Sequence, residues 1–176
     1  FSYPSDNTNF VMKFCIEKNY AMLSQQAANL VAQRLCHNPN LVLGLATGAT
    51  PLGLFKILAE KFKKKELDFS LATTFNLDEY CGLFPVHPQS YRSFMEANLF
   101  SKININRNRI FFPSCSLNSC QDYEEKIRNA GGIDLQILGI GRNGHIGFNE
   151  PGSKFDSRTR IVRLSQTTIE DNSRFF

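Results

Sequence analysis

Asn143, His145 and Glu150 are polar side chains suited to proton transfer, and they lie within eight residues of one another. An imidazole can accept and donate protons near neutral pH, and a nearby carboxylate can orient it and stabilise its charged form. Each residue also has an ordinary structural explanation. Asn-Gly is a common turn dipeptide, a single histidine among glycines is more often a turn residue, and Glu150 could mark a solvated loop exit. The specific order of the whole segment, GHIGFNEP, favours a catalytic loop.

The segment that precedes this loop predicts a buried strand. It is the apolar run Ile133–Ile140, in which only Asp134 and Gln136 are polar, and it continues into a loop rich in glycine. Open α/β sheets place their active sites at the carboxyl ends of such strands. We therefore expect the loop that carries His145 to lie at the edge of a sheet.

A second turn of interest follows another predicted strand, Leu41–Ala46. The sequence Thr47-Gly48-Ala49-Thr50 comes next, and a helix is predicted over Leu52–Lys64, with Pro51 suited to its first position. A strand, a Gly/Thr turn and a helix together direct free N–H groups at one point, where an anion is favoured. The alternative is a plain turn in which Thr50 caps the helix.

A third turn follows the predicted strand Ala72–Leu77 and begins with Asp78. An acid placed where a parallel strand ends faces the same crevice as the other strand ends. The alternatives are that Asp78 caps a turn, or that Asp78 and Glu79 form a solvated pair. In an extended chain Glu79 points away from Asp78, and we expect no catalytic role for it.

The whole pattern of strands alternating with helices predicts an α/β fold, with an open, parallel, Rossmann-like sheet and helices on both faces. The three turns should then converge at one sheet edge. Further strands are predicted over Phe10–Ile16, Ile110–Phe112 and Thr159–Leu164, and further helices over Tyr20–Leu35, Ser90–Leu99, Cys120–Asn129 and Thr167–Phe176.

Composition excludes several classes of function. The 176 residues carry a net charge of +4 and no dense basic patch, so we expect no nucleic-acid partner. No apolar stretch reaches membrane-spanning length, and residues 1–10 lack the features of a signal peptide. The five cysteines are scattered and match no zinc pattern, so we expect reduced thiols in a cytoplasmic protein, and no metal site.

A nicotinamide cofactor is not expected either. The segment Gly139–Gly144 does match GxGxxG after a strand. However, Gly147, Pro151 and Gly152 prevent a helix from opening there, and no acid stands about 20 residues further on. We expect a chemistry that uses no cofactor.

Several motifs resemble those of the glucosamine-6-phosphate deaminase family, whose members are also called isomerases. These motifs are LGLATGATPLG, FNLDEYCGL, HPQSYRSFM, GIGRNGHIGFNEPGS and SRTRI followed by NSRFF. The resemblance runs from about Met12 to Phe176. It implies a deaminase/6-phosphogluconolactonase-like fold and the conversion of glucosamine 6-phosphate and water to fructose 6-phosphate and ammonia.

The resemblance also implies roles for individual residues. His145 would move a proton from the anomeric hydroxyl to the ring oxygen as the sugar ring opens, with Glu150 holding and polarising the imidazole. Asp78 would take the proton from C2 and return it to C1. The phosphate of the substrate would be bound by Thr47, Gly48, Ala49, Thr50 and Arg174.

Asn143 departs from some members of this family, which carry an aspartate at that position to orient the histidine. An amide can accept a hydrogen bond but brings no charge, so His145 is expected to be less basic here than beside an aspartate. Activity is expected to survive, because other members have asparagine.

Within this resemblance residues 1–11 are an extension or an expression remnant, and residues 12–176 are a sugar-phosphate isomerase/deaminase domain. The chain ends on Phe175-Phe176 without a helix stop signal, and family members continue further, so we expect a C-terminal part with a phosphate-binding lysine to be missing.

Some bacterial members are hexamers regulated by N-acetylglucosamine 6-phosphate. Ser153 and Arg160 are compatible with that site, but Lys154 and Val162 are not. We therefore expect no such regulation, and a homo-oligomer remains possible.

Three other functions stay open. One is a 6-phosphogluconolactonase, although that family typically has a Thr-Ala-Ser-type sequence after its histidine, where Ile146-Gly147-Phe148 stands here. Another is a sugar-phosphate-sensing domain of a transcriptional regulator, which would not need Asp78, His145 and Glu150 together. The third is a non-catalytic fragment.

Overall fold

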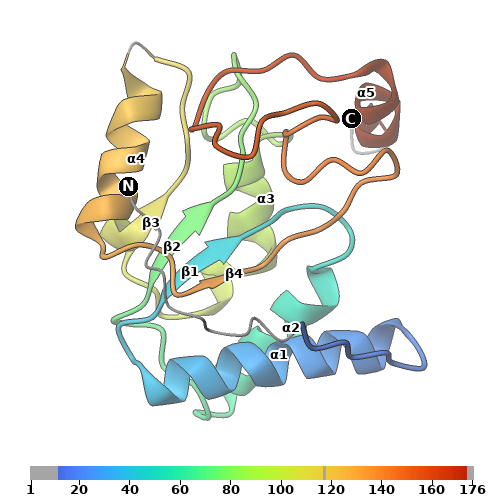
Figure 1. The fold of residues 1–176 in the computed structure, drawn as a ribbon. Helices are drawn as coiled ribbons and strands as arrows, with labels where there is room; N and C mark the ends of the chain where they lie inside the picture. Colours follow the sequence, from blue (N-terminus) through green and yellow to red (C-terminus); the bar gives the residue numbers. More distant parts are fainter. Residues whose placement is uncertain (1–11, 117, 174–176) are drawn as a thin grey trace, which may run out of the picture.

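The computed structural model describes residues 12–116 and 118–173 (Figure 1). Its centre is a four-stranded sheet in the order β3-β2-β1-β4, and each neighbouring pair is parallel. The strands are β1 Val42–Leu45, β2 Thr73–Asn76, β3 Ile110–Phe111 and β4 Leu135–Gln136. The predicted open parallel α/β sheet is confirmed.

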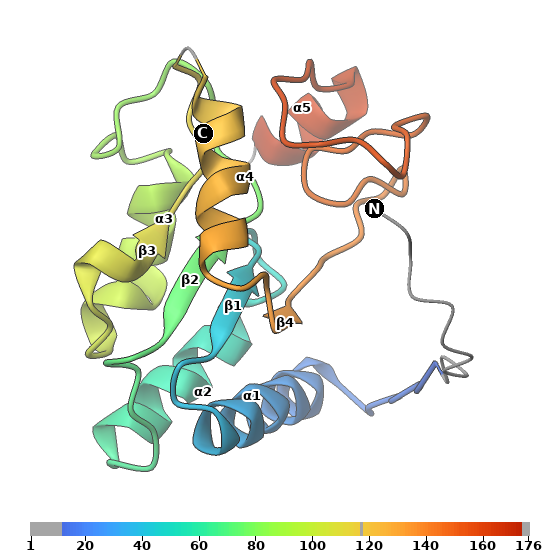
Figure 2. The same ribbon diagram turned by 60° about the vertical axis from the view of Figure 1, so that its left-hand side comes forward.

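Helices lie on both faces of this sheet, as predicted. The helices of the described residues are α1 Tyr20–His37, α2 Leu52–Lys63, α3 Tyr91–Asn98, α4 Ser119–Asn129 and α5 Gln166–Ser173, with short 3-10 turns at Phe100–Lys102 and Arg107–Arg109. Of these, α5 lies beyond the strand ends rather than on a face (Figure 1). In Figure 2, α4 lies in front of the strands, and α1 and α2 run along the lower end of the sheet.

Alternating side chains of the strands build two hydrophobic layers. Leu43 and Leu45 of β1 pack with buried side chains of α1, α2 and α3, such as Val31, Phe55 and Met95. On the opposite face Val42 and Phe75 pack against Tyr123 of α4. Each fully buried side chain of this size contributes about 1.5–3 kcal/mol, so both layers hold the strand ends in fixed relative positions.

Local sequence signals explain where several helices begin and end. The side chain of Asn19 caps α1 by accepting a hydrogen bond from the Met22 N–H at 3.0 Å, and Ser90 caps α3 through Ser93 in the same way. After α4, Gly131 and Gly132 adopt positive φ and return their N–H groups to carbonyls of the last turn.

One strand prediction was too long, and two others were wrong. Only Leu135–Gln136 of the predicted strand Ile133–Ile140 pairs with β1, because the chain leaves the sheet after the Ile137 N–H bonds to Gly44. Residues 159–164 are irregular, and so are residues 12–16 of the predicted N-terminal strand. Both segments contain apolar and β-branched residues, but neither pairs with a strand of the sheet.

The expectation that all cysteines are reduced was also wrong. Cys81 and Cys115 form a disulfide, while Cys15, Cys36 and Cys120 are free. The two bonded cysteines are 34 residues apart in sequence. They meet because they lie in the loops that follow the neighbouring strands β2 and β3, a proximity that spacing alone does not reveal.

The predicted extension at residues 1–11, the phosphate ligand Arg174 and the end of the predicted helix Thr167–Phe176 lie outside the described residues. Across residues 12–116 and 118–173, no helix combines the length and the apolar character needed to cross a membrane.

Candidate active site

A cavity of ≈ 210 Å³ lies where the loops that follow β1, β2 and β4 meet. Thr47, Gly48, Asp78 and His145 all line it, so the predicted turns do converge at one edge of the sheet. Ala49 and Thr50 are exposed and are not part of this lining. The structure thus brings the predicted acid, imidazole and glycine/threonine loop to a common space.

Asp78 lies two residues after the end of β2 and is packed against the loop of His145. A Cβ atom added to Gly147 would lie 3.5 Å from its Oδ2, and Gly147 adopts a φ of +57°, which favours glycine. Burial raises the pKa of Asp78 to about 7, and the nearby charge of Glu79 acts in the same direction. A carboxyl group with this pKa can both accept and return a proton near neutral pH.

The imidazole of His145 is held by Asn143. Its Nδ1 lies 2.7 Å from Asn143 Oδ1, and the His145 backbone N–H donates to the same oxygen at 3.2 Å. Because an amide oxygen only accepts, Nδ1 carries the proton and Nε2 is the atom left to accept one from a substrate. The ring also lies on the backbone of Gly141, where an added Cβ would be 2.1 Å from His145 Cε1.

Within the part of the chain that the structure describes, Glu150 makes no hydrogen bond to the imidazole, so the direct contact that we expected is absent. Its Oε2 accepts from Asn143 Nδ2 at 2.8 Å, so the amide of Asn143 stands between the carboxylate and His145. Since a carboxylate accepts only, this contact fixes the orientation of the amide. Glu150 therefore orients His145 through Asn143 rather than directly.

Hydrogen bonds dominate the electrostatics of Glu150. Partial burial acts to raise its pKa, but the Ser165 N–H, the Thr168 hydroxyl, the Asn143 amide and the Ser165 hydroxyl all stabilise the ionised form and hold the pKa at about 2. Glu150 is therefore a fixed anion at neutral pH and not a proton carrier.

Sequence reasoning missed two hydroxyl residues of this network. Ser165 precedes α5, and Thr168 within α5 is fully buried, with Oγ1 3.2 Å from His145 Nδ1 and 3.1 Å from Ser165 Oγ. Ser165 Oγ also accepts from the Thr168 N–H at 3.3 Å, the pattern of a helix cap. A cap was predictable from the sequence, but its contact with the catalytic loop was not.

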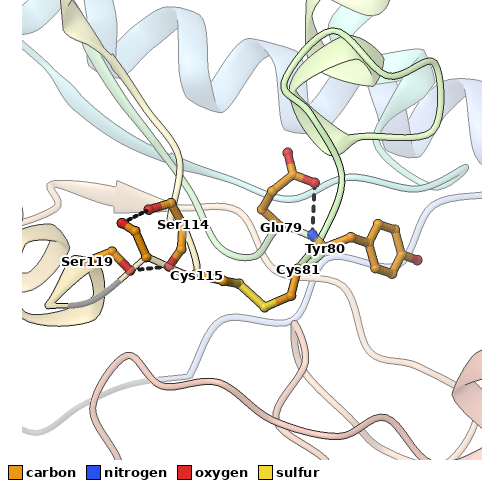
Figure 3. Close-up of a disulfide and its surroundings, with 7 residues drawn as sticks. Glu79, Tyr80, Cys81, Ser114, Cys115 and Ser119 are labelled. Atoms are coloured by element: carbon orange, nitrogen blue, oxygen red, sulfur yellow. Dashed lines mark hydrogen bonds between the residues drawn. A yellow bond between two sulfur atoms is a disulfide. The ribbon is translucent and has the colours of Figure 1, made fainter.

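Glu79 has a structural role that we did not predict. Its Oε1 accepts from the backbone N–H groups of Tyr80 and Tyr91, and its Oε2 from that of Arg92, each at 2.9 Å. The carboxylate therefore stabilises the start of α3. Figure 3 shows its contact with Tyr80 next to the Cys81–Cys115 disulfide.

The turn Thr47–Thr50 was predicted either to bind an anion or to cap α2 through Thr50, and the start of α2 differs from both expectations. The residue at the N-cap of α2, Pro51, makes no side-chain hydrogen bond, and the hydroxyl of Tyr20 from α1 bonds to the first turn instead. It donates to the carbonyls of Ala49 and Thr50 and accepts from the Gly53 N–H at 2.8 Å. Gly48 adopts a φ of +101°, a backbone conformation that favours glycine at this position of the turn.

Within the part of the chain that the structure describes, no group of three or more His, Cys, Asp or Glu side chains is arranged to hold a metal ion.

Known proteins with similar sequences point to one family. Residues 17–167 match the family described as glucosamine-6-phosphate isomerases/6-phosphogluconolactonase. A glucosamine-6-phosphate deaminase of Alkaliphilus metalliredigens is 54% identical over 94% of this chain and 70% of its own length. Glucosamine-6-phosphate deaminase 2 of Bacillus subtilis is 52% identical over 94% of this chain and 68% of its own.

Solved structures agree. A monomeric glucosamine-6-phosphate deaminase matches with a TM-score of 0.91 at 43% identity, over 94% of this chain and 70% of that one. A 6-phosphogluconolactonase from Thermotoga maritima matches with a TM-score of 0.63 at 25% identity, over 76% of this chain and 62% of that one. The sequence match, the fold and the converging turns together place this chain in the glucosamine-6-phosphate isomerase/6-phosphogluconolactonase family.

Proposed function

We propose that this chain catalyses the isomerisation and deamination of glucosamine 6-phosphate, which yields fructose 6-phosphate and ammonia. The observation that carries the proposal is that Asp78, with a pKa of about 7, and His145 line the same cavity. The similar proteins named above are glucosamine-6-phosphate deaminases, which supports the same substrate here.

Ring opening is the task of His145. Nε2 accepts the proton of the anomeric hydroxyl and delivers it to the ring oxygen, so the pyranose opens to the aldehyde. Asn143 holds the Nδ1–H throughout, and Glu150 holds Asn143. The carboxylate thereby keeps the imidazole in the tautomer that can accept a proton on Nε2.

Proton transfer between carbon atoms is the task of Asp78. The aldehyde acidifies the C2 hydrogen, which the Asp78 carboxylate removes, and an enolamine forms. The same group, now protonated, returns the proton to C1, and the resulting C2 imine adds water and loses ammonia. A pKa of about 7 suits a group that is a base in one step and an acid in the next.

Phosphate binding is assigned to the turn Thr47–Thr50 and to Arg174, the latter on the family resemblance alone. Thr47 and Gly48 line the cavity, and α2 begins directly after this turn. These steps use the side chains of the protein and require no cofactor or metal.

A coupled assay tests the proposal. The protein should convert glucosamine 6-phosphate to fructose 6-phosphate and release one ammonia for each turnover, and it should not hydrolyse 6-phosphogluconolactone. Lactone hydrolysis without ammonia release would assign the chain to the other branch of its family. Binding of sugar phosphates without turnover of either substrate would indicate a sensing domain.

Two further properties belong to this proposal. A phosphorylated sugar as substrate supports a cytoplasmic location. The related structure at 43% identity is described as monomeric, so light scattering after size exclusion decides whether this chain forms the homo-oligomer that remained possible from its sequence.

A further inference from the structure

Tyr20, the first residue of α1, makes contacts that the proposed chemistry does not use. Its hydroxyl donates to the carbonyl of Ala49 at 3.2 Å and to that of Thr50 at 3.0 Å, and it accepts from the Gly53 N–H at 2.8 Å. A hydroxyl has one hydrogen, so the two carbonyls share it, and shared donors are common at helix termini. One side chain of α1 thus bonds both to the turn Thr47–Thr50 and to the first turn of α2.

Gly53 allows α1 and α2 to approach closely enough for this contact. A Cβ atom added to Gly53 would lie 2.3 Å from Ser24 Oγ and 3.0 Å from the Tyr20 hydroxyl, so a side chain at this position would displace the contact. Ser24 lies one turn after Tyr20 in α1 and is buried. The hydroxyl of Tyr20 is therefore placed by the packing of α1 on α2, although its ring is half exposed.

The backbone carbonyl and N–H groups of the turn are used differently. The carbonyls of Ala49 and Thr50 bond to Tyr20, which does not line the cavity. In residues 12–116 and 118–173, by contrast, the N–H groups of Gly48, Ala49 and Thr50 have no hydrogen-bond acceptor. Free N–H groups favour a bound anion, and the partial negative charge of a carbonyl oxygen disfavours one. The turn therefore keeps its donors available while Tyr20 occupies two of its acceptors.

We propose that Tyr20 is a positioning residue for phosphate binding, whose hydroxyl holds the Ala49 and Thr50 carbonyls away from the substrate phosphate. This inference rests on the proposed function, because it needs a phosphate in the Thr47–Thr50 turn. Tyr20 acts through the backbone of this turn and does not touch the substrate.

The first test removes only the hydroxyl. Tyr20→Phe should raise KM for glucosamine 6-phosphate about fivefold, within the range for one hydrogen bond, and leave kcat within about twofold. The inhibition constant of inorganic phosphate should rise by the same factor. A variant that melts at a lower temperature but keeps the wild-type KM and phosphate inhibition would show a purely structural contact and would overturn the inference.

The matched control is Tyr123→Phe. It also removes a tyrosine hydroxyl that donates to a backbone carbonyl, that of Asn76, and neither of these two residues lines the cavity. We expect unchanged KM and phosphate inhibition. An equal rise of KM in both tyrosine variants would mean that a general loosening of the fold is responsible, which would refute the specific role of Tyr20.

A double-mutant cycle tests whether Tyr20 acts through the turn. Gly48→Ala disturbs the same turn by another route, because Gly48 has a φ of +101° that side chains disfavour. In that background Tyr20→Phe should have little further effect on KM. An undiminished fivefold rise there would show that Tyr20 affects the substrate by a different route, contrary to the inference.

Thermal unfolding in inorganic phosphate provides a measurement that needs no turnover. A ligand that binds the folded state raises Tm, so phosphate should raise the Tm of the wild type, and by less in Tyr20→Phe. No rise in the wild type, or an equal rise in both proteins, would refute the role of Tyr20. A wild-type chain that phosphate stabilises but that lacks deaminase activity refutes the proposed reaction instead.

Discussion

Asp78 and Glu150 are carboxylates of the same site, but their surroundings shift their pKa values in opposite directions. Asp78 is desolvated at the end of β2, and its pKa rises to about 7. Glu150 receives hydrogen bonds from Ser165, Thr168 and Asn143, and its pKa falls to about 2 despite partial burial. The supply of donors, more than burial, decides which carboxylate carries protons and which remains a fixed charge.

The two regions also differ in what supports them. Asp78 follows a strand that pairs with neighbours on both sides and whose Phe75 packs in the hydrophobic layer against α4. Glu150 lies in irregular chain and is held by side-chain contacts and by the segment leading into α5. The position of Asp78, the proposed proton carrier, is therefore set by the sheet, and that of Glu150 by a network that single substitutions can break.

The largest effect is expected from Asp78→Asn, which removes the proton carrier and keeps the shape. We expect kcat to fall by about 10²–10⁴-fold, the range for loss of a general base. The coupled assay measures this, and a variant that keeps more than about a tenth of the activity would show that another group moves the proton.

The same variant should be more stable than the wild type in alkaline solution. The folded-state pKa of Asp78 is raised, so the stability linked to its protonated form is present below about pH 4 and lost as the pH rises through about 7. Asparagine does not ionise. Thermal unfolding should show a higher melting temperature for Asp78→Asn near pH 8 and no difference near pH 4, and a lower value at both would contradict the raised pKa.

Glu150→Gln is expected to have an intermediate effect on activity. Unlike Asp78→Asn, it should lower the stability of the folded protein. A neutral amide weakens charge-assisted hydrogen bonds and frees Asn143, so we expect kcat to fall about 10–100-fold and stability to fall by about 2 kcal/mol at neutral pH. Because the folded pKa is depressed, the stability due to Glu150 is present above about pH 4.5 and lost as the pH falls toward about 2.

Urea unfolding measures this difference. The gap between Glu150→Gln and wild type should shrink as the pH is lowered from about 7 to about 3.5, and a gap independent of pH would mean that packing, not charge, explains it.

Asn143→Asp should have the smallest effect. It places a second carboxylate against Glu150 and a charge beside His145, in place of the amide that now separates them. We expect the acidic limb of the kcat/KM profile to move upward by about 0.5–1 pH unit, with activity retained at the optimum. An unchanged profile would argue that the charge next to the imidazole has no influence on catalysis.

Much of the fold was predictable from local patterns. The buried runs at β1 and β2, the caps at Asn19 and Ser90 and the glycines after α4 are decided by neighbouring residues. The length of β4 was not predictable, because pairing depends on how far β1 extends beside it.

The candidate site likewise has one part that could be predicted from the sequence and one that could not. Asp78, His145 and Thr47 could be placed at one edge because parallel strands end together. The position of Asn143 between Glu150 and His145 and the contact of Thr168 with His145 were beyond prediction, since each depends on how side chains meet in the folded chain.

The disulfide has a practical consequence for any preparation of this protein. Cys81 comes shortly after Asp78, so an oxidised sample joins the loop of the proton carrier covalently to the loop beyond β3, and a reduced sample leaves the two loops separate. An alkylating reagent distinguishes the two forms, because it finds the three thiols of Cys15, Cys36 and Cys120 in the oxidised form and all five in the reduced form. Reductant is therefore a variable of the kinetics, to be held constant when variants are compared.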